Sequence, residues 1–468
     1  MSQSKPPLLQ DATRDLARFG ASLRYGDIPH DVVDRIKLSI LDSLGCCLFG
    51  ATLPWTRKVA ELAIHEGGQP VASLLGMGHK TSVSLAALVN GTAGHAFELD
   101  DIHKESIIHP GSLATPVALA LAEEQGKASG KDVITAMVAG YEIGTRVGNA
   151  ATMSLFFRGF HPQGTSGVFV AAAAASRMLN LDAGSFQHAL GIVASQAGGL
   201  MAAQEGAMVK RFHGGRAAQS GVYAARLASM GFTGISDVLE ASYGGYLSSL
   251  SDKPNAARLT AGLGSVWETL QIGYKPHASV TSIHSALDGL AEIMRENGLR
   301  ADDIAEVQAG LSPMTHVHCA WTYKAQGVTA AQMNLFFGLA AIALEGAAFT
   351  AQFRESKLSD PRILDFIGRI KAYVDPEIDA MGAAFRHASR VRVESRDGGR
   401  FEKLTLHRRG SPENPLSAED IVYKFRNVVA PCMSNADADH VIALVERLET
   451  LKSLPELIQA VGAPVRAG

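Results

Sequence analysis

The 468-residue chain is 47% hydrophobic and 19% charged, a balance that excludes an extensively disordered protein and leaves enough apolar material for two folding units. Its 43 Lys and Arg against 46 Asp and Glu give a net charge of −3, which excludes the basic field that holds nucleic acid. Any anionic ligand must therefore be bound by local cations.

The four cysteines show neither CxxC nor Cys/His spacing, so they offer no ligand set for zinc or an iron–sulfur cluster and indicate a reducing cytoplasm. The N-terminal stretch lacks a basic region followed by an apolar one, and no later apolar run reaches membrane-spanning length. We therefore expect a cytoplasmic protein without a membrane segment.

Residues 11–237 consist of Ala- and Leu-rich segments separated by Gly, Pro and Asn, a pattern that predicts an all-helical region. Its small side chains predict helices that pack closely and bury most of their surface. Residues 267–409 mix alternating strand-like runs with helical segments, which predicts a smaller α+β domain.

Two local signals mark the end of this domain and the segment after it. The Asp397-Gly398-Gly399 sequence predicts the turn of a β-hairpin, because these residues tolerate positive φ. Ser417, with Asp420 three residues later, predicts the start of a helix in a helical C-terminal segment.

The densest group of titratable residues lies within residues 90–112, around the end of an apolar helix. It comprises Glu98, Asp100, Asp101, His103 and His109. Placed at the end of an apolar helix, these groups would have perturbed pKa values and point into a cleft. A solvated loop whose acids cap the neighbouring helix fits the spacing equally well. A metal site at Asp100 and His103 is less favoured, because no second pair repeats the pattern.

A second segment places His161 and Pro162 before the Gly164–Gly167 run, at the start of an Ala-rich helix. Free N–H groups and the helix dipole would favour a carboxylate there, with Thr165 adding a hydroxyl donor. Ordinary capping by Thr165 is the alternative, and one residue can serve both purposes.

A third segment puts Lys210, Arg211 and His213 at the head of another helix. Cations at a helix N-terminus oppose the dipole, so a nearby anion would resolve the conflict and indicates a ligand. Alternatively, these cations face water or pair with the acids of the first group.

Two further candidates come from later in the chain. Lys275 could anchor a carboxylate or act as an acid or base if it is buried. Tyr323 could donate a proton, although a half-buried tyrosine with its hydroxyl at the surface is more common. Neither a G-x-S-x-G elbow nor a nucleotide-binding glycine motif is found, so neither a serine nucleophile nor a nucleotide cofactor is implied.

Several blocks, taken in order, resemble the MmgE/PrpD family. They are DSLGCCLFG, NGTAGHAFELDDIHKESIIHPGS, GFHPQGTSGVF, GAMVKRFHGGRAAQSG, KPHASVTSIHSALDGL and NPLSAEDIVYKF. The resemblance implies a mainly α protein whose large all-helical domain is formed by residues 1–266 and 411–468, with a smaller, lid-like α+β domain at 267–410. It also implies a homodimer with its active site between the domains, and neither a metal nor an organic cofactor.

The resemblance implies roles for individual residues as well. The family's acidic pair corresponds to Asp100 and Asp101, and its histidines correspond to His109 and His161. Its lysines correspond to Lys210 and Lys275. Glu98 stands where many members have Asp, and the loop to His109 is about one residue longer, which counts against a simple assignment as a 2-methylcitrate dehydratase or cis-aconitate decarboxylase.

We expect a cofactor-independent lyase of the dehydratase type that acts on a small di- or tricarboxylate. The cations would hold the carboxylates, and His161 or His109 would remove the α-proton. Tyr323 or the other histidine would then protonate the leaving group. An epimerase of a dicarboxylate such as iminodisuccinate, a cis-aconitate-type decarboxylase and a non-catalytic carboxylate-binding paralogue are the alternatives.

Overall fold

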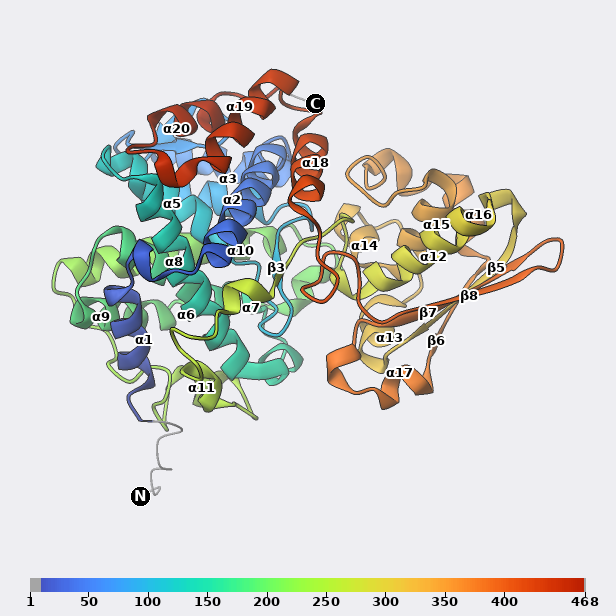
Figure 1. Cartoon of the computed structure of the whole chain (residues 1–468), viewed down its shortest axis with the longest axis horizontal. Coiled ribbons are helices and arrows are strands. Elements are labelled where there is room, and N and C mark those ends of the chain that lie inside the picture. The colour runs from blue at the N-terminus through green and yellow to red at the C-terminus, as the bar shows by residue number, and fades with distance from the viewer. Residues whose placement is uncertain (1–9, 467–468) are drawn as a thin grey trace.

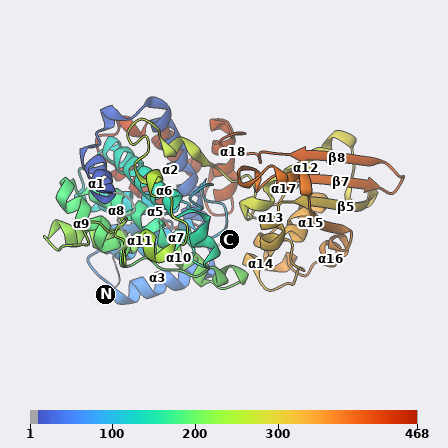
Figure 2. The same ribbon diagram turned by 90° about the horizontal axis from the view of Figure 1, so that it is seen from below.

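The computed structural model describes residues 10–466, and its elements confirm a mainly helical class (Figure 1). The chain forms two lobes, which lie side by side in both ribbon views (Figures 1 and 2). We refer to them as the helical lobe and the sheet lobe. The predicted domain boundaries at 266/267 and 410/411 stay a prediction.

The helical lobe combines helices from both ends of the chain around one large hydrophobic cluster. Its N-terminal helices are α1 (Ala12–Ser22), α2 (His30–Gly50), α3 (Pro54–Glu66), α4 (Val83–Gly94), α5 (Gly111–Gln125), α6 (Gly130–Phe157), α7 (Pro162–Thr165), α8 (Gly167–Met178), α9 (Ala183–Ala194), α10 (Val209–Ser229) and α11 (Tyr246–Leu250). Its C-terminal helices are α18 (Ala418–Val429), α19 (Asn435–Glu446) and α20 (Pro455–Gly462). Helix α18 packs against α2, so the last part of the chain completes the first lobe.

Small residues bring these helices close together. A Cβ atom on Gly215 of α10 would lie 2.2 Å from the carbonyl oxygen of Leu88 on α4. A Cβ atom on Gly144 of α6 would lie 2.1 Å from Cγ2 of Val170 on α8. Because real Cβ atoms cannot approach so closely, only glycine allows these helix pairs to pack at this distance.

The prediction that residues 11–237 are all helical is wrong in detail. Strands β1 (Ala72–Leu74) and β2 (His79–Thr81) pair with each other, and β3 (Ile102–His103) pairs with β4 (Ile272–Gly273). The short β3–β4 pairing joins the acidic segment after α4 to the segment that carries Lys275.

The sheet lobe is a four-stranded sheet with helices beside it. The strands are β5 (Ile304–Leu311), β6 (Ile370–Val374), β7 (Ser389–Ser395) and β8 (Arg400–Thr405), in the order β6-β5-β7-β8. The helices are α12 (His284–Asn297), α13 (Pro313–Cys319), α14 (Val328–Met333), α15 (Leu335–Glu345), α16 (Pro361–Ile367) and α17 (Pro376–Ala380). β6 is parallel to β5, and the other two pairings are antiparallel.

Two local predictions are confirmed here. β7 and β8 form the predicted hairpin, with Val391 opposite Lys403 and Gly398 at a φ of +88° in the turn. The side chain of Ser417 accepts a hydrogen bond from the Asp420 N–H, and Asp420 reaches back to Ser417 in a capping box.

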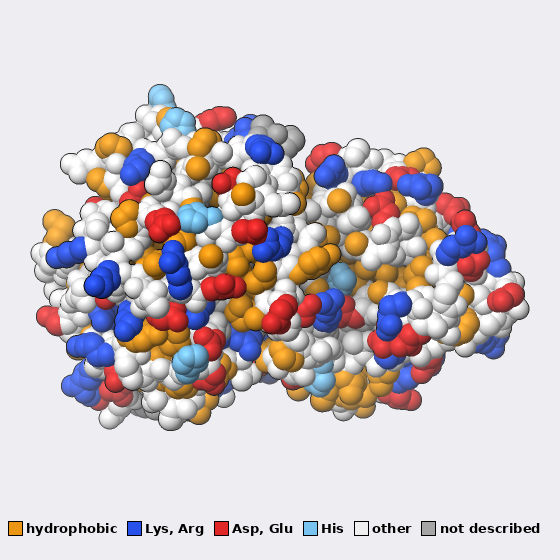
Figure 3. All heavy atoms as spheres, turned by 45° about the horizontal axis from the view of Figure 1, so that its top comes forward, with side chains coloured by type: hydrophobic (Ala, Val, Ile, Leu, Met, Phe, Trp, Pro, Cys, Tyr) orange, Lys and Arg blue, Asp and Glu red, His pale blue; other side chains and the backbone are white. Residues whose placement is uncertain are grey.

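A groove separates the two lobes in the space-filling view, and charges of both signs are interspersed over the face shown (Figure 3). Within residues 10–466, no single helix is both long and apolar enough to cross a bilayer, although the bent α2–α3 pair passes a test of length and composition.

Candidate active site

The segment after α4 is buried, which excludes the solvated-loop interpretation. Glu98, Asp100 and Asp101 are exposed by 3%, 0% and 0% respectively. Glu98 has a φ of +56°, a left-handed backbone conformation that is uncommon outside glycine. Strain of this kind persists only where the surrounding structure imposes it, and such positions gather at functional sites.

Glu98 is held by three buried cations. Its Oε1 atom accepts hydrogen bonds from Lys210 and Arg211, and its Oε2 atom lies 3.2 Å from Nζ of Lys275. Burial alone would raise the pKa of Glu98, but the charges of Lys210, Lys275 and Arg211 outweigh it and hold that pKa well below its usual range. The cations at the head of α10 therefore pair with the first acidic group, which was the alternative to a ligand.

The same cluster changes the acidity of Lys210. Burial lowers the pKa of Lys210 to about 8, although Glu98 opposes the shift, and the nearby charge of Arg211 adds to it. Lys210 can therefore exchange a proton near neutral pH, whereas Arg211 serves as a fixed charge and also donates to Oε1 of Gln332 at 3.0 Å.

Asp100 organises two histidines. Its Oδ2 atom lies 2.8 Å from Nδ1 of His95, and its Oδ1 atom lies 3.4 Å from Nδ1 of His109. The Nδ1–H of His109 donates to the carbonyl oxygen of Asp101 at 2.7 Å. This bond fixes the tautomer, because it places the ring proton on Nδ1 and leaves the Nε2 lone pair free to accept a proton. Burial lowers the pKa of His109 to about 3, so its imidazole is neutral at pH 7.

The histidines continue as a row of neighbouring rings. The His95 ring lies 5.0 Å from the His109 ring and 5.8 Å from the His161 ring, between centroids. Nδ1 of His161 lies 2.9 Å from Nδ1 of His213. Burial lowers the pKa of His161 well below its usual range, and the charge of Lys210 adds to this effect. The row therefore consists of neutral imidazoles.

Asp101 lies behind this row. Its carboxyl group accepts hydrogen bonds from the Tyr141 hydroxyl at 2.6 Å and from the Gly111 N–H at 2.9 Å. Burial raises the pKa of Asp101 to about 8, with the neighbouring carboxylates of Asp42 and Asp100 contributing in the same direction.

The candidate site is a cavity of about 70 Å³ between the two lobes. Five of the twelve predicted site residues line it: Glu98, His109, His161, Lys210 and Lys275. The cavity adjoins a more open groove of about 890 Å³, because Phe156, Met201, Gln204 and His318 line both. The groove provides access from solvent.

Four predicted residues, Asp100, Asp101, Arg211 and His213, do not line the cavity but contact its walls, as described above. Three others have different surroundings. Nε2 of His103 lies 3.0 Å from Oε2 of Glu268, and the Tyr323 hydroxyl donates to the carbonyl oxygen of Leu358 at 2.9 Å. Tyr323 does not line the cavity, and its proton-donor role stays a prediction.

The helix start after His161 shows the capping alternative, and the anion site expected there stays a prediction. The N–H groups of Gly164 and Thr165 both donate to the carbonyl oxygen of His161, and so does the Thr165 hydroxyl, at 3.0 Å. These donors are satisfied within the turn, and α7 is only one turn long. Thr165 therefore stabilises the turn.

Several cavity residues were missed by sequence reasoning: Lys104, Thr281, Ser282, His318, Arg386 and His387. His95 was missed as well. His95 precedes Asp100 by five positions at the end of an apolar helix, and this spacing could have indicated that the two side chains meet. The adjacent Arg386 and His387, directly before the strand at Ser389, gave only a weak one.

A metal ion could be held by His95, Asp100 and His109, whose potential ligand atoms lie within 4.8 Å of one another. The Asp100–His103 pair considered from the sequence is not part of this group. In the structure, His95 is hydrogen-bonded to the carboxylate of Asp100, and His109 is hydrogen-bonded to the carbonyl oxygen of Asp101.

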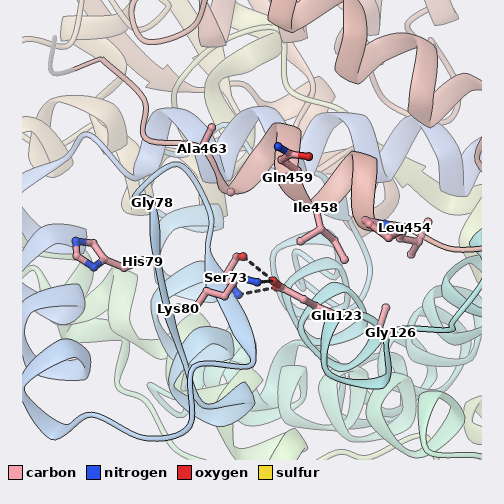
Figure 4. Close-up of a pocket in the computed structure, with 13 residues that line it drawn as sticks. Ser73, Gly78, His79, Lys80, Glu123, Gly126, Leu454, Ile458, Gln459 and Ala463 are labelled. Carbon is pink, nitrogen blue, oxygen red and sulfur yellow. Dashed lines mark hydrogen bonds and ion pairs between the residues drawn. The ribbon is translucent and has the colours of Figure 1, made fainter.

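Another cavity, of about 560 Å³, lies on the helical lobe between β1, β2, α5 and α20 (Figure 4). Its carboxylate, Glu123, accepts hydrogen bonds from the N–H and hydroxyl of Ser73 and pairs with Lys80 at 2.8 Å. Because these partners satisfy Glu123, this cavity offers no group prepared for chemistry.

The fold and the site together define a two-lobed protein with a buried, cation-rich cavity suited to a small anion. The chain belongs to the MmgE/PrpD family: the MmgE/PrpD N-terminal domain matches residues 14–258, and the MmgE/PrpD C-terminal domain matches residues 277–450. This confirms the resemblance inferred from the sequence blocks.

Three relatives extend the comparison. A cis-aconitate decarboxylase of Aspergillus terreus is 32% identical over 97% of this chain and 96% of its own length. The cis-aconitate decarboxylase-like protein oryM of Aspergillus oryzae is 31% identical over 96% of each chain. The human cis-aconitate decarboxylase is 26% identical over 98% of this chain and 96% of its own length.

Proposed function

We propose that this protein is a lyase that acts on a small di- or tricarboxylate through proton transfer at a carbon close to a carboxylate. The observation that carries the proposal is the cavity wall where Lys210, Lys275 and Arg211 meet a single carboxylate, Glu98, beside the free Nε2 of His109. The family membership and the names of the relatives support the same class of reaction.

The cations supply both binding and catalysis in this scheme. Three positive charges against one negative charge leave an excess that attracts a substrate carboxylate. When the reacting carbon gains charge, the same cations stabilise it without rearranging, because Glu98 already holds them in place. Preorganised charge of this kind usually makes the largest contribution to catalysis.

Among lyase reactions, we place decarboxylation of a cis-aconitate-type tricarboxylate first, because four relatives of similar length are named cis-aconitate decarboxylase. In this reaction the bond to the departing CO₂ breaks, and its electron pair forms a new C=C bond. The former C=C bond takes up a proton at its CH carbon. Lys210, with a pKa of about 8, is the proton donor that we assign to this step.

Dehydration, which the sequence favours, is the second candidate. It requires a base for the proton next to the carboxylate, and the free Nε2 of His109 supplies one. A bound polycarboxylate would raise the pKa of His109 from about 3, since negative charge favours the protonated ring. Lys210, whose pKa of about 8 leaves it protonated at neutral pH, would then protonate the leaving hydroxyl.

Proton NMR in D₂O tests these reactions with citrate, 2-methylcitrate, cis-aconitate, malate and iminodisuccinate. Loss of CO₂ with a new terminal alkene identifies a decarboxylase, and a vinyl signal formed from a hydroxy acid identifies a dehydratase. Exchange or diastereomer conversion alone identifies an epimerase. Binding without any change identifies a non-catalytic paralogue and contradicts the proposal.

Variants at the cations test the scheme itself. Lys210→Met and Lys275→Met should each lower kcat/KM about a hundredfold to a thousandfold, as loss of a charge-stabilising donor does. Arg216→Met is the matched control, because Arg216 lies on the same helix but bonds to Gln219. Full turnover by both lysine variants would overturn the scheme.

Three expectations stay predictions: the homodimer and the activity without a cofactor that the resemblance implies, and the cytoplasmic location inferred from the cysteines and the N-terminal stretch. Light scattering of the purified protein tests the first, and assays after dialysis against a chelator test the second.

A further inference from the structure

The cavity has a second positively charged end, far along the chain from Lys210. Lys104, Arg386 and His387 line it, and the first comes from the helical lobe while the other two precede β7 in the sheet lobe. Nζ of Lys104 donates to the carbonyl oxygen of Ala384 at 2.6 Å, and Arg386 donates to the carbonyl oxygen of Lys104 at 2.8 Å. These reciprocal bonds join the two lobes at the cavity.

Arg386 has donors to spare. It is 6% exposed, and its Nη1 donates to Oε1 of Glu105 at 2.9 Å and to the carbonyl oxygen of Ala383. Its Nε–H has no acceptor among residues 10–466. A guanidinium group offers five N–H donors in a planar fork, so Arg386 retains an edge that fits a carboxylate.

His387 adds a second buried nitrogen without a partner. Among the described residues, its Nδ1 atom has no hydrogen-bond partner, and the same holds for Nδ1 of His318, which lines the cavity as well. Buried polar atoms are normally satisfied, so unsatisfied nitrogen atoms on three residues that line one cavity, Arg386, His387 and His318, indicate a ligand. The ligand must offer acceptors, because the arginine group can only donate.

The charge at this end is also positive. Lys104 and Arg386 lie together, and the contacting carboxylate is that of Glu105, whose side chain is 46% exposed. Burial lowers the pKa of Lys104, and the charge of Arg386 lowers it further. A carboxylate of the ligand would relieve this repulsion.

We propose that Lys104, Arg386 and His387 form a second carboxylate subsite that makes the protein prefer tricarboxylates to dicarboxylates. The first subsite, at Lys210 and Lys275, takes the carboxylate next to the reacting carbon. The second takes the most distant carboxylate of the same molecule. This inference rests on the proposed function and identifies its substrate as a compound with carboxylates at both ends.

Calorimetric titration with two unreactive ligands tests the subsite without turnover. Propane-1,2,3-tricarboxylate and methylsuccinate differ in one terminal carboxylate, which is hydrogen in the second. We expect the wild type to bind the tricarboxylate at least about tenfold more tightly, as one charge-assisted pair would give.

Arg386→Gln should weaken the tricarboxylate about tenfold and change the Kd of methylsuccinate less than twofold. Lys104→Met should act in the same direction and leaves the Arg386–Glu105 pair in place, which protects the test if Arg386→Gln folds poorly. Lys210→Met should weaken both ligands. Arg392→Gln, on the exposed face of β7, is the control that should weaken neither.

Equal weakening of both ligands by Arg386→Gln and Lys104→Met, or no weakening by either variant, would overturn the second subsite. If the wild type turns over a polycarboxylate in this case, the proposed function stands and only the subsite fails. If the wild type binds neither ligand and converts no polycarboxylate, both proposals fail.

Discussion

Glu98 and Asp101 lie three residues apart and are both buried, yet their surroundings shift their pKa values in opposite directions. Glu98 faces the cavity and is ionised by three cations. Asp101 lies behind the cavity, bonds to a phenol and a backbone N–H, and is protonated up to a pH of about 8. The same loop therefore places a charged carboxylate, Glu98, at the cavity and a neutral carboxyl group, Asp101, in the core.

The difference shows which charges serve the ligand and which serve the fold. Around Glu98 the positive charges exceed the negative ones, a state that costs stability unless an anion binds. The two groups that bond to Asp101, the Tyr141 hydroxyl and the Gly111 N–H, are neutral, so the protonated carboxyl group fits the core without a counterion. Four measurements test this assignment of charges.

The largest expected effect comes from Glu98→Gln. Three buried cations would lose their carboxylate, and breaking a buried ion pair at one partner costs about 3–5 kcal/mol. Urea denaturation at pH 7 measures this change in the free energy of unfolding. Asp101→Asn is the matched control, and we expect no loss of stability, because the native group is already neutral in the fold and asparagine leaves no buried charge without a partner. Similar costs for the two variants would contradict the comparison.

His109→Gln tests the tautomer assignment. Glutamine can still donate to the Asp101 carbonyl group, but it offers no basic nitrogen to the cavity. We expect α-proton exchange in D₂O to fall about a hundredfold or more, as loss of a general base does, with an unchanged melting temperature. Retained exchange would transfer the role of the base to His161.

The pH dependence of stability tests Asp101. Its folded pKa is raised from 3.8 to about 8, so its contribution to stability is complete below pH 4 and is lost as the pH rises through 8. We expect the melting temperature of the wild type to fall by a few degrees between pH 7 and 9. Asp101→Asn should flatten this slope, and because both proteins contain Lys210, its titration cancels. Parallel slopes would show that Asp101 is ionised in the fold.

The smallest expected effect is that of a chelator. His95, Asp100 and His109 already bond to one another or to Asp101, so removal of divalent metal ions should leave kcat unchanged. Atomic absorption of the dialysed protein provides the control. Loss of activity that Zn²⁺ restores would instead assign these residues to a metal site.

Local patterns predicted much of the fold. The β7–β8 hairpin depends on residues next to one another, Asp397 to Gly399, and the start of α18 depends on Ser417 and Asp420. Close helix packing followed from the abundance of small residues. The short β3–β4 pair was not predictable, because two-residue strands 169 positions apart leave no periodicity.

The part of the candidate site that could be predicted is the part where charged residues stand in an unfavourable place on a helix. Lys210 and Arg211 oppose the dipole of α10, and that conflict indicated an anion, which proves to be Glu98. Arg386 was missed because it meets Glu105 across 281 positions and resembles a surface arginine. Sequence alone could not show that the Tyr323 hydroxyl bonds to the carbonyl oxygen of Leu358.

The buried Lys424 on α18 has a consequence for the order of synthesis. Its Nζ atom pairs with Asp42 on α2 at 2.6 Å and donates to the carbonyl oxygen of Leu99, just before Asp100. The lysine follows Leu99 by 325 positions. At about 5–20 residues per second, the ribosome adds it on the order of tens of seconds later. Until then the nascent chain holds Asp42 without its cation, and α2 lacks the contact with α18 that completes the helical lobe.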